Sequence, residues 1–350
     1  MVKKPTIKDV AQRAGVSIAT VSFVLNNRPG QVISERVKKR VWRAAEQLKY
    51  HPSAAAAGLA RKRTHNVAII FYREENQISN QFYSFVVQGA VKEAIRRQYN
   101  LLFSYLPHEY AGYSDLPKVI REKNAEGAIF VQHVDERLVR DIEARGIPVV
   151  AIDNFPHISK LNSLQIDNRR GGQLAAEHLL ELGHQHLAFL YSGLDRPSIA
   201  ERAEGFEGAI VQRGLSYSVR NNLIECSAFT FEAGYEEMLR VFARKRRPTG
   251  LLCANDEIAA GALRAAHELG LSVPRDVSVV GFDNISMSAY TDPPLTTVAV
   301  DKEALGSRAM DRLLELVEQD GRASVPIKEI VPVELVVRQS TSRPPSKQAK

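Results

Sequence analysis

The chain has 350 residues, of which 25% are charged, and its formal net charge is +7. This length predicts two or three domains rather than one small core. No run approaches the ~20 apolar residues of a membrane span, and the basic N-terminus lacks the apolar stretch of a signal peptide. The two cysteines, Cys226 and Cys253, lie far apart without metal-type spacing, which favours buried thiols in a reducing cytoplasm.

The basic residues gather at the N-terminus. Residues 1–65 hold 14 Lys and Arg against three acids, a net charge of +11, and the rest of the chain carries −4. A basic head on a mildly acidic body indicates a polyanion-binding module joined to an ordinary domain.

Two short helices joined by a tight turn are expected at the start of the chain. Thr6 caps the first, over residues 7–14, Gly15 supplies the turn, and Ser17 caps the second, over residues 18–26. Apolar residues recur at helical spacing on both. This pattern predicts a helix-turn-helix, whose second helix can enter the DNA major groove. The alternative, a helical hairpin packed on a larger domain, is disfavoured by the charge.

A third helix is expected from Ser34 to about Leu48, ended by Pro52. Residues 53–64 read SAAAAGLARKRT. A helix this short is marginal in water, so it forms only against a partner copy or DNA. A plain interdomain linker is the alternative.

From Asn66 onward, short apolar runs alternate with longer amphipathic stretches, which is typical of parallel sheets covered by helices. Two similar lobes are expected rather than one large sheet. Ligands in such sheets bind outside the carboxyl ends of the strands. The main apolar runs are 67–72, 101–106, 128–131, 148–152, 164–166, 186–191, 250–254 and 277–282.

Several motifs together resemble the lactose/galactose-repressor (LacI/GalR) family of bacterial transcription regulators. They are TIKDVAQRAGVSIATVSFVLN, AIDN, GGQLAAEHLLELGH, ERAEGF, CANDEIAAGAL, VSVVGFDN and LTTVAVDKEALG, in collinear order. The resemblance implies an all-α helix-turn-helix head, a hinge helix, an α/β body of two lobes like a type I periplasmic-binding protein, and a homodimer. The implied segments are a head at 1–52, a hinge at 53–65, a body at 66–342 (N-lobe about 66–166 and 297–328, C-lobe about 167–296 and 329–342) and a disordered tail at 343–350.

The resemblance also implies which residues touch DNA. Phe23 stands where the family often has arginine, so direct reading leans on thymine methyls and DNA shape; alternatively, Phe23 is a core residue. Leu59 matches the hinge leucine that wedges into the minor groove, with Ala56 one turn earlier; the alternative is that Leu59 packs on the body. The remaining implied contacts are Thr6, Ser17, Ile18, Ala19, Thr20, Ser22 and Asn26.

The resemblance places an effector between the two lobes. The implied residues combine carboxylates, amides, guanidinium groups and aromatic faces, which suits a sugar or sugar derivative, with a nucleobase as the alternative. Three other roles stay open: Arg202 pairs with Asp283 in the empty site, Asp256 caps the next helix, and Phe82 is core. The implied effector residues are Phe82, Tyr83, Asp153, Arg196, Ser198, Arg202, Phe229, Asn255 and Asp283.

An enzyme is not expected. The sequence has no GxGxxG, P-loop, GxSxG or metal-spaced cluster, so no catalytic residue, cofactor or metal is predicted. A solute-binding protein is a stronger rival, but the basic head and the lack of a signal peptide disfavour it. We therefore expect a transcriptional regulator, with repression favoured over activation, that binds a palindromic DNA operator as a homodimer under effector control.

Overall fold

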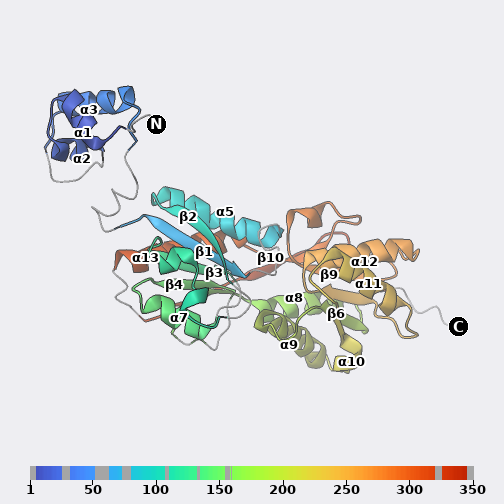
Figure 1. Cartoon of the computed structure of the whole chain (residues 1–350). Helices are drawn as coiled ribbons and strands as arrows, with labels where there is room; N and C mark the ends of the chain where they lie inside the picture. The colour runs from blue at the N-terminus through green and yellow to red at the C-terminus, as the bar shows by residue number, and fades with distance from the viewer. Residues whose placement is uncertain are drawn as a thin grey trace. The chain divides into compact units, whose positions relative to one another are not determined.

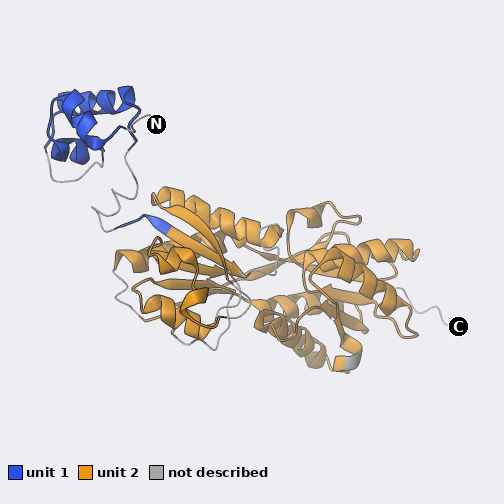
Figure 2. Cartoon of the chain, in the orientation of Figure 1, with its two compact units in different colours: residues 1–66 blue, residues 67–350 orange. Residues whose placement is uncertain are grey.

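The computed structural model describes residues 5–25, 32–51, 63–72, 80–106, 110–131, 135–153, 158, 160–319 and 325–344 (Figure 1). It divides into two compact units, residues 1–66 and residues 67–350, called here the head and the body (Figure 2). The predicted DNA contacts Asn26, Ala56 and Leu59 lie outside the described residues, as does most of the expected hinge helix and of the tail.

Local hydrogen bonds in the head explain its turns. The Asp9 carboxylate accepts hydrogen bonds of 2.7 Å from both the backbone N–H and the hydroxyl of Thr6. Gly15 has a φ of +61°, the left-handed conformation that glycine adopts at low cost. The Ser17 hydroxyl accepts a 3.0 Å hydrogen bond from the Thr20 N–H. Both predicted helix starts and the turn are confirmed for helices α1 (Ile7–Ala14) and α2 (Ile18–Leu25), which pack with α3 (Glu35–Gln47).

The body contains two six-stranded sheets, one in each lobe. The N-lobe sheet has the order β11-β5-β4-β3-β1-β2, and the C-lobe sheet has the order β12-β10-β9-β8-β6-β7. Pairs such as β1–β3 and β8–β9 are parallel, whereas β12 runs antiparallel to β10. The strands are β1 (Asn66–Tyr72), β2 (Asn100–Leu106), β3 (Gly127–Val131), β4 (Val149–Ile152), β5 (Asn162–Ile166), β6 (Leu187–Tyr191), β7 (Leu223–Glu225), β8 (Gly250–Cys253), β9 (Ser278–Asp283), β10 (Thr296–Val300), β11 (Lys328–Val331) and β12 (Val333–Val336).

Helices cover these sheets, as the alternating pattern predicted. Leu116 and Pro117 separate a 3-10 turn from the short helix α6, because proline disfavours helix in the residue before it. The helices are α5 (Gln81–Arg96), α6 (Lys118–Arg121), α7 (Glu136–Glu143), α8 (Asn168–Glu181), α9 (Pro197–Gln212), α10 (Val219–Asn222), α11 (Phe231–Phe242), α12 (Asp256–Glu268) and α13 (Lys302–Glu318), with the 3-10 turns η1 (Tyr113–Asp115) and η2 (Ser286–Ala289).

The chain crosses between the lobes at three places. The first is at Asp167, between β5 and α8; the second is at Asp301, between β10 and α13; and the third is at Pro332, between β11 and β12. The later two crossings fall a few residues beyond the boundaries expected near 296 and 328, because β10 pairs with β9 along its length and β11 pairs with β5 to its end.

Glycines let α8 and α9 pack with their backbones in contact. A Cβ on Gly172 of α8 would lie 2.0 Å from the carbonyl oxygen of Arg202, and one on Gly205 of α9 would lie 1.9 Å from that of Arg169. These distances are far below van der Waals contact, so only glycine fits. This close pairing fixes the backbone position of Arg202, which is one of the predicted effector-binding residues.

Gly205→Ala is expected to destabilise the body. The new methyl group forces α8 and α9 apart, and overpacking of this kind costs about 1–3 kcal/mol. Urea denaturation of both proteins measures the difference in the free energy of unfolding. Gly208, on the same helix, has nothing within 4 Å of an added Cβ, so Gly208→Ala is the matched control and should be neutral or stabilising, by up to about 1 kcal/mol. Equal effects of the two substitutions would contradict the packing argument.

Candidate functional site

Helix α2 has one buried and one accessible face. Val21 and Val24 are buried in the head core, whereas Ile18 is 44% exposed. Ala19 is also exposed, and Phe23 is half-buried. Because Phe23 is half-buried, its contact with DNA and its alternative role as a core residue both stay predictions. Ile18 and Ala19 therefore give α2 an accessible apolar surface.

The smaller polar residues predicted to contact DNA lie around this face. Thr6 and Ser17 are exposed, and Thr20 and Ser22 are half-buried. The hydroxyls of Ser17 and Thr20 are 2.9 Å apart. These groups can donate hydrogen bonds to phosphate or base edges.

In the body, Arg202 is the centre of the predicted effector site. It is 5% exposed. Its Nε donates a 2.9 Å hydrogen bond to Asn168 Oδ1, and its Nη1 donates to the carbonyl of Ala254. Its guanidinium carbon lies 3.6 Å from the centre of the Phe282 ring. Its Nη2 lies 4.0 Å from Asp283 Oδ1, so the pairing of these two residues is observed.

Two carboxylates stand at strand ends beside this guanidinium. Asp153 directly follows β4, and Asp283 is the last residue of β9. Both have positive φ, 54° and 98°, a conformation that is costly for a residue with a Cβ and that often marks functional sites. Burial raises the pKa of both carboxyls, while the nearby Arg202 charge opposes the rise. Such carboxyls can accept or donate hydrogen bonds to ligand hydroxyls.

A second group of predicted residues lies together on the C-lobe. The Arg196 guanidinium carbon is 5.0 Å from the centre of the Phe229 ring. Asn255 Nδ2 donates a 3.4 Å hydrogen bond to the Phe229 carbonyl. Arg196 is the N-cap of α9, and Ser198 lies in the first turn of that helix. This group offers a guanidinium, an aromatic face and an amide.

The two aromatic candidates on α5 differ. Phe82 is 6% exposed and belongs to the apolar core, so its alternative role as a core residue is the one observed. Its ring meets that of Tyr83 edge-on, with centroids 5.1 Å apart. Tyr83 is only partly buried and keeps accessible surface. Phe82 therefore supports Tyr83 by packing.

Asp256 does not cap α12, which corrects that expectation. Asn255 is the cap, and its Oδ1 accepts a 2.8 Å hydrogen bond from the Ile258 N–H. Asp256 turns inward instead: it is 1% exposed and accepts hydrogen bonds from Thr297 Oγ1 at 2.6 Å and the Ile285 N–H at 2.8 Å. Burial, with the nearby Asp283 charge, raises the pKa of its carboxyl to about 8.

This raised pKa predicts a pH-dependent stability. The folded chain binds the Asp256 proton more tightly than the unfolded chain, so stability falls as pH rises above the ordinary pKa and through the folded pKa. As the pH rises from about 6 to about 8, ionisation of Asp256 lowers the free energy of unfolding by about 2 kcal/mol. Asp256→Asn cannot ionise and should flatten the profile over that range. Urea unfolding of both proteins across the range measures this, and parallel profiles would contradict it.

Sequence reasoning also missed Asn168 and Lys302. Asn168 is buried and accepts from Arg202. Lys302 begins α13, is 8% exposed, and donates to the carbonyls of Asp283, Asn284 and Val300. Their positions directly after the lobe crossings at Asp167 and Asp301 were the available signal, because crossings border the space between lobes.

A basic helix-turn-helix head on a two-lobed binding body defines a transcription regulator that senses a small molecule. Among the described residues, no helix is long and apolar enough to cross a bilayer. Residues 6–53 match the family described as bacterial regulatory proteins, lacI family, and residues 176–341 match a periplasmic binding protein-like domain.

Relatives match over nearly the whole chain. The HTH-type transcriptional repressor PurR of Aliivibrio fischeri is 32% identical, over 96% of this chain and 98% of its own. The lac repressor dimer bound to operator and the anti-inducer ONPF has a TM-score of 0.83 and 28% identity, covering 97% of this chain and 100% of that one. A complex of the transcriptional regulator CelR with cellobiose has a TM-score of 0.72 and 25% identity, covering 96% and 99%. The chain belongs to the lacI family of DNA-binding transcriptional repressors, which are not enzymes.

Proposed function

We propose that this chain binds a palindromic operator as a homodimer in the cytoplasm, and that a small molecule held between its lobes sets its affinity for DNA. The observation that carries this proposal is the buried group around Arg202, a ready polar site, in the same chain as a separate helix-turn-helix unit. The similar lac repressor was solved as a dimer on its operator, which supports the same assembly here.

For the head, the accessible face of α2 supports the predicted contacts. Ile18, Ala19 and Phe23 offer only apolar surface toward the bases, so specificity comes from thymine methyls and DNA shape. Ser17, at the start of the helix, also faces the bases. Thr6, Thr20 and Ser22 bind phosphates or nearby base edges. Further proposed contacts are Asn26, Ala56 and Leu59, which lie outside the described residues.

For the body, we favour a sugar or sugar derivative. Asp153, Asp283 and Arg202 can each hold hydroxyl groups by paired hydrogen bonds, and Phe229 and Tyr83 offer flat faces for stacking. The solved CelR complex holds cellobiose, which shows that a similar protein accommodates a sugar. Arg196, Ser198 and Asn255 complete the proposed site.

One observation supports a nucleobase as the second candidate. Arg196 lies over Phe229 with 5.0 Å between guanidinium and ring centre. An aromatic ring beside a planar five-donor fork suits a flat heterocycle with carbonyl or ring-nitrogen acceptors. The two candidates share the site and differ only in ligand class.

A thermal-shift screen of the full chain distinguishes them. Sugars, polyols, uronates and nucleobases are tested singly; a ligand at 100 times its Kd stabilises the folded state by about 2.7 kcal/mol. A shift with a sugar, lost in an Arg202→Met variant, supports the proposal. Shifts with nucleobases alone overturn the sugar assignment, and shifts that persist in the variant place the site elsewhere.

Selection from random DNA tests the assembly. The full chain is expected to enrich sequences with two inverted half-sites, because a two-fold symmetric dimer presents two identical α2 helices. Enrichment of a single, non-repeated half-site would contradict the homodimer.

A further inference from the structure

The segment Asp283–Ser286, which runs from the end of β9 to the start of η2, contacts both the proposed effector site and the N-lobe. Asp283 faces Arg202 through its carboxylate, while its carbonyl accepts a hydrogen bond from Lys302 Nζ. The next residue, Asn284, also has a left-handed φ, of 51°, and its carbonyl accepts from the same Nζ at 3.2 Å. Two consecutive left-handed residues thus bring two carbonyls to one ammonium.

Lys302 belongs to the other lobe. It begins α13, which packs on β3 and β4 of the N-lobe. Its third acceptor is the carbonyl of Val300, at 3.2 Å, in the C-lobe strand β10. Three acceptors match the three protons of an ammonium group. A buried ammonium that loses such partners is costly, so Lys302 must follow the carbonyls when they move.

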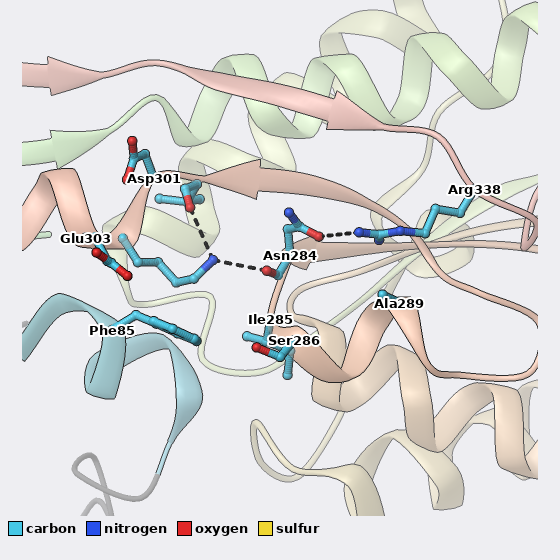
Figure 3. A pocket seen from close by; sticks show the side chains of 10 residues that line it. Phe85, Asn284, Ile285, Ser286, Ala289, Asp301, Glu303 and Arg338 are labelled. Carbon is cyan, nitrogen blue, oxygen red and sulfur yellow. Dashed lines mark hydrogen bonds between the residues drawn. The ribbon is translucent and has the colours of Figure 1, made fainter. Parts of the chain in front are cut away.

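Asn284 lines a cavity beside this junction, where Arg338 holds its side chain. The cavity measures about 410 Å³ and is lined by both lobes, with Phe85 of α5 on one side and Ile285, Ser286 and Ala289 on the other (Figure 3). The Asn284 side chain accepts a 2.7 Å hydrogen bond from Arg338 Nη2, drawn as a dashed line in Figure 3. The Asn284 carbonyl can therefore shift only together with its segment.

Helix α5 makes a second link to the same segment. Gln81 Oε1 accepts a 3.1 Å hydrogen bond from the Ser286 N–H. Beside it, Asn80 Nδ2 donates to Glu257 Oε1 of the C-lobe at 3.2 Å. Gln81 is exposed, so its side chain is not needed for the core. The segment is thus held from the N-lobe at both ends.

We propose that Lys302 is a positioning residue that ties the effector-binding end of β9 to the N-lobe, with Gln81 as a second tie, so that the state of Asp283 sets the angle between the lobes. The inference rests on the proposed function for the role of Asp283 in effector binding. A ligand that reorients Asp283 changes the geometry of both carbonyls, and α13 follows through the ammonium.

Electron-spin distance measurements on the full chain test this without effector or operator. Spin labels are placed on Glu122→Cys in the N-lobe and Gln212→Cys in the C-lobe, both exposed positions. Cys226 and Cys253 are 2% and 0% exposed and should escape labelling. An excess of unlabelled chain leaves one labelled protomer in each assembly. In the background with native Lys302, one narrow distribution of interlobe distances is expected.

Lys302→Met should broaden this distribution or shift it to a different distance, and Gln81→Ala should act in the same direction more weakly. Lys92→Met is the matched control, because Lys92 pairs with Glu303 and both residues belong to N-lobe helices. Thermal melting checks that each variant is folded; if Lys302→Met does not fold, Gln81→Ala decides. An unchanged distribution in the folded variants, or an equal change with Lys92→Met, overturns the inference while leaving the proposed function intact.

Discussion

Arg202→Met is expected to abolish measurable effector binding. The substitution keeps an apolar stem over the Phe282 ring but removes every hydrogen bond to Asn168 and Ala254. It also leaves Asp283 without its nearest guanidinium. Removing one partner of a buried charged contact costs about 2–5 kcal/mol of binding free energy. Titration with the compound that gives the largest shift in the screen measures the loss.

The variant should also be less stable without ligand. Burial raises the pKa of the Asp153 and Asp283 carboxyls and Arg202 opposes this rise, so its loss raises both pKa values further and makes the ionised carboxylates more costly to bury. Arg213→Met is the matched control, because Arg213 ends the same helix and pairs at 3.8 Å only with the exposed Glu181 among the described ion pairs. Unchanged affinity in Arg202→Met, or equal losses in both variants, would show that the ligand binds away from Arg202.

Deletion of residues 1–64 is expected to remove specific operator binding and to preserve effector binding. The deleted part carries +11, whereas the rest of the chain carries −4, and specific sites are commonly bound about 10³-fold or more tightly than other DNA. The body, residues 67–350, is a compact unit by itself, so it should still unfold cooperatively. Fluorescence anisotropy with the selected operator, at several salt concentrations, measures the loss.

The same compound that stabilises the full chain serves as the control for the truncated body. Its melting shift should be equal in both proteins, because every proposed effector residue lies in the body. Specific operator binding by the truncated body would disprove the division of roles between the two units. Loss of the melting shift would place part of the effector site in the head.

Local features of the sequence predicted much of this structure. Thr6, Gly15 and Ser17 marked the helix starts and the turn of the head because caps and left-handed turns need particular side chains. The alternation of apolar runs predicted the sheets of the body. The resemblance implied Arg202, Asp283 and Asp153 as effector residues, and the structure places Arg202 beside Asp283.

Contacts between distant segments were harder to predict. Asn255 and Asp256 are adjacent, and both residue types can cap a helix; only the pocket formed by Thr297 and Ile285 decides that Asp256 turns inward. Phe82 and Tyr83 are similarly alike in sequence, and their burial depends on helix orientation. The role of Lys302 depends on where the chain crosses between the lobes, and the crossing expected near 296 lies at Asp301.

The three crossings at Asp167, Asp301 and Pro332 have a mechanical consequence. Two rigid lobes joined by one segment can rotate and slide in many directions, whereas three connecting segments restrict their relative motion. Each lobe here is rigid because its helices pack with their backbones in contact at glycines. If effectors bind between the lobes as proposed, chemically different molecules act on the same restricted motion of one lobe against the other.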